Sequence, residues 1–149
     1  MVEKLQKLFA MSVCYRHNLH MLHWKVKGPE FDCVHKLLDD YVGKFNEFID
    51  EIAEMLLSFD SYPLTLQECL DLLSKDSDDV LVVESDEDYD SEEVFKAIGI
   101  MFDGLYNLYT EIRQDKSTDE YSECGGKLDE HKYWLRLENN YKNKRRMKD

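Results

Sequence analysis

The stretch that decides the fold runs from residue 32 to residue 58 and reads DCVHKLLDDYVGKFNEFIDEIAEMLLS. Its large apolar residues recur at steps of three and four, the period of an α-helix with one buried face. They are Val34, Leu38, Tyr41, Phe45, Phe48, Ile52 and Leu56. No proline interrupts the stretch, and a break follows between Ser58 and Pro63. The pattern therefore predicts one long helix over about residues 32–58.

The same rhythm occurs on both sides of this stretch. A first series predicts a helix over about residues 3–27, which Gly28 and Pro29 end. Its members are Leu5, Leu8, Ser12, Tyr15, Leu19, Leu22 and Val26, with Ser12 the one polar residue. A later series predicts a helix over about residues 92–115, with acidic residues in its first turn. Its members are Val94, Ile98, Met101, Leu105, Leu108 and Ile112.

The connection between these halves is long and acidic. Thr65 and Glu68 form a capping box that predicts a short helix over about residues 66–73. Residues 76–93 carry ten acidic residues and no basic one, so residues 76–90 are interpreted as a solvated crossover in which only Val80 to Val83 docks locally.

A last helix is predicted over about residues 119–143, after a second capping box at Ser117 and Glu120, and a basic tail occupies residues 142–149. Two helices, a long crossover and two more helices predict an all-α, ferritin-like four-helix bundle with a short extra helix in the crossover. The whole chain, 1–149, is expected to form one such domain.

Composition limits the classes of function. The formal net charge of −13 repels the nucleic-acid backbone and attracts cations, including divalent metals. The four cysteines show no C-x-x-C spacing and the first residues do not resemble a signal peptide, which favours a cytoplasmic location. No run approaches the roughly 18 apolar residues that a membrane span requires, so no membrane role is expected.

Candidate metal ligands lie on the stretch that decides the fold. At about 100° per residue, His35, Asp39, Asp50 and Glu54 share one arc roughly opposite the buried face. About 16 Å of helix rise separates Asp39 from Asp50, so one chain cannot close a site with all four. An antiparallel copy of the helix, related by a two-fold axis near Phe45, would bring the His35 end of one chain to the Glu54 end of the other.

Two further residues fit this arrangement. Gly43 lies on the same arc and would allow two backbones to approach closely. His23 ends the first predicted helix and is expected to reach the site. Two imidazoles and three carboxylates suit iron or zinc better than copper(I). Each of these residues taken alone is more often an ordinary surface side chain, and the hypothesis rests on their conjunction.

The ordered set of residues resembles a known family. The run His23-Trp24-Lys25-Val26-Lys27-Gly28-Pro29 with Phe31, followed by His35, Asp39, Asp50, Ile52, Ala53 and Glu54, is similar to the Dps-type miniferritins. The resemblance extends over the chain and is strongest from about residue 19 to residue 57. It implies a homo-oligomer, a hollow dodecamer built from two-fold dimers, that oxidises Fe(II) at di-iron sites between subunits and stores the iron.

The resemblance also implies roles for the individual residues. His23, His35 and Asp39 would come from one subunit and Asp50 and Glu54 from its partner, with Glu54 bridging. Hydrogen peroxide, or dioxygen, would be the oxidant, and the protein would protect against oxidative stress. Trp24 would either pack the site or donate electrons. Independently of the resemblance, His17 and His20 precede His23 at three-residue steps, and they either mark an auxiliary metal path or are ordinary helix-surface or interface histidines.

Three functional questions stay open at this stage. Asp115, Asp119, Glu120 and Glu123 surround the last interhelical turn, where they either line a pore that funnels cations or are simply solvated. The basic tail either binds DNA or complements the helix dipole. The alternative to a ferroxidase is a non-catalytic helical shell that sequesters metal or compacts DNA.

Overall fold

The helices of this chain form because each carries one continuous apolar stripe. The structure, a computed structural model, describes residues 1–74, 83 and 86–114. Within this part the elements are α1 (Val2–Lys25), α2 (Phe31–Ser58), α3 (Leu66–Ser74) and α4 (Ser91–Gln114). All are helices, and the described residues contain no strand beyond one isolated bridge between Val26 and Tyr89. The predicted helix over residues 119–143 and the basic tail lie outside the described residues.

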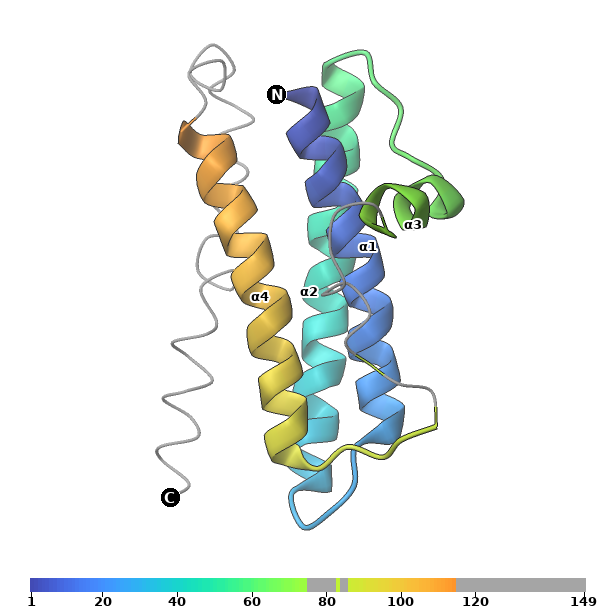
Figure 1. The fold of residues 1–149 in the computed structure, drawn as a ribbon, viewed down its shortest axis with the longest axis vertical. Helices are drawn as coiled ribbons and strands as arrows, with labels where there is room; N and C mark the ends of the chain where they lie inside the picture. Colours follow the sequence, from blue (N-terminus) through green and yellow to red (C-terminus); the bar gives the residue numbers. More distant parts are fainter. Residues whose placement is uncertain (75–82, 84–85, 115–149) are drawn as a thin grey trace.

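The long helices lie side by side. Figure 1 shows α1 and α2 joined by a tight turn at one end of the bundle, with α4 alongside them. The short α3 lies across the outer side of α1, so the crossover between the two halves begins on one flank of the hairpin. None of the helices in this part of the chain is long and apolar enough to cross a membrane.

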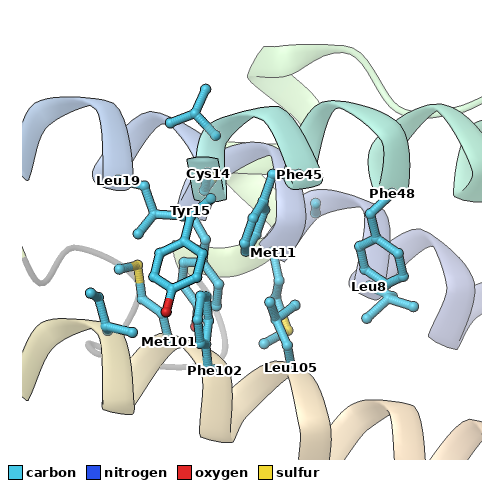
Figure 2. Close-up of a cluster of buried hydrophobic side chains, with 14 of the residues drawn as sticks. Leu8, Met11, Cys14, Tyr15, Leu19, Phe45, Phe48, Met101, Phe102 and Leu105 are labelled. Atoms are coloured by element: carbon cyan, nitrogen blue, oxygen red, sulfur yellow. The ribbon is translucent and has the colours of Figure 1, made fainter. Parts of the chain in front are cut away.

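The core is made of the predicted stripes. Every apolar member of the series on α1, α2 and α4 is buried, and Ser12 is buried as well, its hydroxyl donating to the Leu8 carbonyl oxygen at 2.7 Å. Figure 2 shows the centre of this core, where Phe45 of α2 and Phe102 of α4 stack with their ring centroids 5.8 Å apart. Tyr41 and the same Phe102 ring form a T-shaped pair with their centroids 5.2 Å apart. Phe102 and Phe95 are buried although they lie outside the predicted stripe of α4.

One glycine lies where α1 and α4 pack closely. A Cβ atom on Gly104 would stand 3.3 Å from Cε of Met11 and 3.4 Å from the Tyr15 hydroxyl oxygen. The first contact is tighter than ordinary van der Waals packing, so an alanine here would require the end of the Met11 side chain to shift by a few tenths of an ångström.

The capping box before α3 forms as predicted. The Thr65 backbone N–H donates to Oε1 of Glu68 at 3.0 Å, and the Glu68 N–H donates to the Thr65 hydroxyl oxygen at 3.3 Å. Hydrogen bonds from the Thr65 backbone N–H and, in smaller part, from the Thr65 side chain stabilise the ionised carboxylate and hold the pKa of Glu68 below its ordinary value. The box fixes where α3 begins, because two backbone groups at the helix start are satisfied reciprocally.

The end of the crossover is tied to the turn between α1 and α2. The Lys27 N–H donates to the Tyr89 carbonyl oxygen at 2.8 Å, and the Tyr89 N–H donates to the Lys25 carbonyl oxygen at 3.2 Å. The Lys25 ammonium also donates to the Glu87 carbonyl oxygen at 3.0 Å. Val83 is half-buried against the core, and residues 80–82 lie outside the described part. The acidic segment is predicted to be solvated, and the side chains of Asp86, Glu87, Asp88 and Asp90 are exposed, while Tyr89 between them is buried beside the turn.

Candidate metal centre

A sharp reversal of the chain brings two imidazoles together. Val26 leaves α1 in an extended conformation, with φ −64° and ψ 134°. Gly28 follows at φ 108°, a conformation that side-chain-bearing residues rarely adopt, and the Phe31 N–H then donates to the Gly28 carbonyl oxygen at 3.1 Å. The last turn of α1 and the first turn of α2 therefore face each other, with His23 on one and His35 on the other.

The two histidines hold each other in place. Nδ1 of His23 lies 2.8 Å from the His35 carbonyl oxygen, and Nδ1 of His35 lies 2.8 Å from the His23 carbonyl oxygen. Their rings stack with centroids 3.6 Å apart and planes inclined by 21°. Both side chains are half-buried. Two hydrogen bonds and one stacking contact thus fix both ring orientations from both helices.

This reciprocity decides which nitrogen is available for binding. A carbonyl oxygen only accepts, so each Nδ1 must carry the proton and donate it. In the neutral imidazole the lone pair then resides on Nε2. A backbone carbonyl that receives the second ring N–H is the usual support of a metal-binding histidine. The pair accordingly presents two Nε2 atoms suited to a borderline metal ion such as Fe(II) or Zn(II).

Further aromatic rings flank the pair on both sides. Phe31 stacks on His35 with ring centroids 4.8 Å apart, and His20 lies 6.0 Å from His23. Trp24 stacks on His20 at 4.9 Å with an inclination of 17°, and its side chain is 61% exposed. Within the single chain Trp24 therefore packs on His20 at the surface and not into the core.

The carboxylates of the predicted site lie elsewhere on α2. Asp39, Asp50 and Glu54 are all exposed, on the side of α2 that the core does not use. Among residues 1–74, 83 and 86–114, no three side chains of the types His, Cys, Asp and Glu come close enough to hold a metal ion. The chain by itself brings His23 and His35 together and leaves the three carboxylates apart, so it holds at most part of a five-ligand site.

The centre of the same α2 surface is low and polar. Nothing stands within 4 Å of the position that a Cβ atom on Gly43 would take. One turn further, the Arg16 guanidinium of α1 donates to Oδ1 of Asn46 at 2.9 Å. Close approach by another helix is therefore unobstructed at Gly43.

Several other candidates fall outside this geometry. His17 is exposed on α1. The predicted pore residues Asp115, Asp119, Glu120 and Glu123 lie outside the described residues, as does the tail at 142–149. Sequence reasoning did not identify Phe31 as a ring that supports His35, nor the two carbonyl oxygens that orient the imidazoles. The aromatic residue four positions before His35 was a usable signal for the first, since i and i+4 share a helix face. Backbone acceptors leave no such signal.

Comparison with known proteins places this geometry in context. The model of the ferritin-like domain matches residues 2–115. A curated relative, the DNA protection during starvation protein of Helicobacter pylori, is 30% identical over 119 residues, which cover 79% of this chain and 76% of that protein. The fine tangled pili major subunit of Haemophilus ducreyi is 38% identical over 60 residues. This match covers 40% of this chain and only 30% of that protein.

A solved structure shares the fold at low sequence identity. The Dps protein from Vibrio cholerae O1, described as a member of a broad superfamily of ferritin-like diiron-carboxylate proteins, superposes with a TM-score of 0.77. It is 17% identical, and the match covers 94% of this chain and 87% of that one. The four-helix bundle predicted from the sequence is confirmed by this likeness together with the family match.

Proposed function

This chain is a Dps-type member of the ferritin-like family, and on that premise we propose that it oxidises Fe(II) at sites shared between two copies and stores the product. Iron binding in general accords with a family of diiron-carboxylate proteins. The intersubunit site, its ligands and the oxidant are the parts that we add.

The observation that carries the proposal is the locked pair of imidazoles. His23 and His35 each use Nδ1 to bind the other's carbonyl oxygen, at 2.8 Å, which leaves both Nε2 lone pairs for a metal ion. A pair that served only to pack the turn would not need both rings oriented by the same atom. Two nitrogen donors are too few for an iron centre, so the remaining ligands must come from carboxylates.

A second copy supplies these carboxylates by symmetry. Asp39 and Asp50 lie equally far from the midpoint of α2, and so do His35 and Glu54. An antiparallel pairing of two α2 helices about that midpoint therefore sets the imidazole end of one copy against the carboxylate end of the other. Each dimer would contain two equivalent sites, each with His23, His35 and Asp39 from one copy and Asp50 and Glu54 from the other. The open surface at Gly43 lies close to the axis.

The chemistry needs two ferrous ions held close together. Each Fe(II) gives up one electron, and one hydrogen peroxide molecule takes both electrons with two protons to form two water molecules. Because both electrons leave from one place, peroxide is reduced without releasing a hydroxyl radical. The side chains of the site bind and position the two ions, and Glu54 bridges them. Dioxygen is the alternative oxidant.

The wider role follows the same premise. We propose a hollow dodecamer of two-fold dimers that works in the cytoplasm and limits oxidative damage by consuming iron and peroxide together. The name of the Helicobacter pylori relative refers to DNA protection, and the basic tail at residues 142–149 is the segment of this chain that would contact DNA. A shell that only sequesters metal or compacts DNA remains the second candidate.

The test is oxidation of Fe(II) loaded without oxygen and then mixed with peroxide. Ferric absorbance should rise rapidly in the wild type, and the rate should fall about tenfold or more in His35→Ala and in Glu54→Ala, since each removes a ligand from both sites. Glu111→Ala is the matched control, because Glu111 is an exposed carboxylate on α4, away from α2. Equal rates in all four proteins would reject the catalytic proposal and favour the non-catalytic shell.

A further inference from the structure

Four of the seven large apolar side chains that are exposed in the described part of the chain lie at the two ends of α2; the others are Leu66 and Leu70 on α3 and Ile100 on α4. Trp24 and Phe31 are 61% and 38% exposed at the end that carries the imidazoles. Leu57 and Tyr62 are 50% and 85% exposed at the opposite end. Scattered apolar side chains on a surface are normal, but the rings of Trp24 and Phe31 stack on histidines and the backbone of Tyr62 is fixed by a hydrogen bond.

Tyr62 stands on a backbone that a single side chain fixes. The Gln6 amide nitrogen on α1 donates to the Ser61 hydroxyl oxygen at 3.1 Å and to the Tyr62 carbonyl oxygen at 2.8 Å. The Gln6 amide oxygen accepts the Leu64 N–H at 3.3 Å. Just before this segment, Asp60 turns the chain with φ 59°. A tyrosine exposed on a fixed backbone loses little freedom when another surface covers it.

The aromatics at the other end are ordered as well. Trp24 stacks on His20 at 4.9 Å, and Phe31 stacks on His35 at 4.8 Å. Trp24 is thus an exposed ring with a defined orientation, and tryptophan and tyrosine are the side chains most enriched among the residues that dominate binding between proteins. Each end of α2 presents one of them.

One symmetry relation connects the two ends. Phe31 and Ser58 are the first and last residues of α2, at equal distances from its midpoint. The proposed two-fold axis passes through the same midpoint and pairs His35 with Glu54 and Asp39 with Asp50. At about 100° per residue, Leu57 falls on the same arc of α2 as Asp50 and Glu54. The register that completes the ligand set therefore also sets the Leu57 end of one copy on the Phe31 end of the other.

We propose that Tyr62 and Leu57 of one copy pack over Trp24 and Phe31 of a second copy and close the outer end of the metal centre to bulk water. The inference rests on the proposed two-fold arrangement and adds the residues that seal it. Each exposed apolar end of α2 is covered by the opposite end of α2 in a second copy. A single register then brings the imidazoles to the carboxylates and also brings the exposed apolar side chains of the two copies together. Exclusion of water at this point strengthens the electrostatic binding of the cations.

The test places a photoreactive benzophenone amino acid at position 62 of the full chain, without metal. Irradiation should link position 62 to a residue between 24 and 31. Position 62 lies beside Gln6, and the helix rise of α1 from Gln6 to Trp24 separates positions 62 and 24 by about 27 Å within one chain, so any such link joins two copies. A second attachment at Leu57 should link to the same segment, and it keeps the test valid if position 62 does not tolerate the change. Circular dichroism checks that each protein folds.

The control and the outcomes separate this inference from the proposed function. The same reagent at Ile100, which is 40% exposed on α4, should give no link to residues 24–31. Links from positions 57 and 62 only to other segments would overturn the seal. Links to residues 24–31 in a protein that shows no peroxide-dependent oxidation would leave the seal standing and reject the ferroxidase. Oxidation without these links would reject the seal alone.

Discussion

His23 and His35 each donate Nδ1–H to the other's backbone carbonyl oxygen, both at 2.8 Å, so each ring is oriented by the helix that carries the other. The orientation of each imidazole therefore does not depend on a metal ion. It depends on the turn between α1 and α2 having its native conformation. The face of the pair that carries the two Nε2 atoms is thus ordered by the chain itself.

The first prediction concerns the tautomers of these rings. In the metal-free protein, the neutral imidazoles of His23 and His35 should both carry the proton on Nδ1. Nitrogen-15 chemical shifts of the ring atoms measure this directly. The exposed His17 serves as the reference ring in the same spectrum. A proton on Nε2 of either residue would contradict the reciprocal hydrogen bonds between the two histidines, and that Nε2 would then have no lone pair for a metal ion.

The second prediction is complementation between two inactive variants. His35→Ala and Glu54→Ala chains should each be inactive alone, since every site lacks one ligand. In a mixed dimer, one site combines both defects and the other combines the intact His35 end with the intact Glu54 end. Random pairing makes half of the dimers mixed, so co-expressed chains should recover about a quarter of the wild-type sites. No recovery would indicate a site within one chain or none at all.

The third prediction follows from a buried thiol. Burial, and in smaller part the neighbouring Cys69, raise the pKa of Cys14 from 9.0 to about 11. Between these values the folded thiol keeps its proton while the unfolded one loses it, so the folded state binds more protons and stability falls as pH rises. The free energy of unfolding should drop by up to about 2 kcal/mol from pH 9 to pH 11.

Urea unfolding at a series of pH values measures this loss. Cys14→Ala is expected to be less stable at neutral pH, because a buried side chain is shortened, but it should lose less stability on going to pH 11. Cys33→Ala, which changes an exposed thiol, should keep the wild-type slope. Identical slopes in all three proteins would show that Cys14 does not contribute to the alkaline loss.

The fourth prediction compares two glycines. Gly28→Ala should lower the free energy of unfolding by about 1 kcal/mol or more, because alanine is strained at φ 108° even though no atom stands within 4 Å of its Cβ position. Gly43→Ala is the comparison, since in the single chain its Cβ would also meet nothing within 4 Å. Gly43 lies inside α2, where alanine favours the helix by about 0.5–1 kcal/mol. At protein concentrations that keep the chains apart, the thermal unfolding temperatures of the two variants should therefore move in opposite directions. In the proposed dimer Gly43→Ala should lose this gain, because a second backbone approaches the same position.

The sequence predicts the helices well because their evidence is local. Heptad-like spacing identified every apolar stripe of α1, α2 and α4, and the capping box at Thr65 identified the start of α3. The anchoring of Tyr89 to Lys25 and Lys27 could not be predicted, because it uses backbone atoms that are far apart along the chain. The hydrogen bonds from Gln6 to the segment after α2 could not be predicted either, since a half-buried glutamine in a helix has no distinguishing sequence pattern.

For the candidate site too, the local features could be predicted from the sequence and the contacts that depend on the backbone conformation could not. The face that His35, Asp39, Asp50 and Glu54 share follows from the helical period alone, and the assignment of these ligands stays a prediction. The approach of His23 to His35 was expected only in outline. Its atomic form depends on the φ of Gly28 and on two carbonyl oxygens, which the residue types do not encode.

The bridge between Val26 and Tyr89 has a consequence for the order in which the chain folds. The Lys25 to Glu87 hydrogen bond beside it joins residues 62 positions apart, whereas the contacts that form the α1–α2 hairpin are closer along the chain. Closing a long loop costs more chain entropy than closing a short one, so the hairpin can form before the bridge does. The turn between the two imidazoles would then be secured only when α4 docks. A nascent chain that has made its first two helices already contains both partners of the histidine pair, and the second half of the bundle adds the backbone bridge that holds the turn from outside.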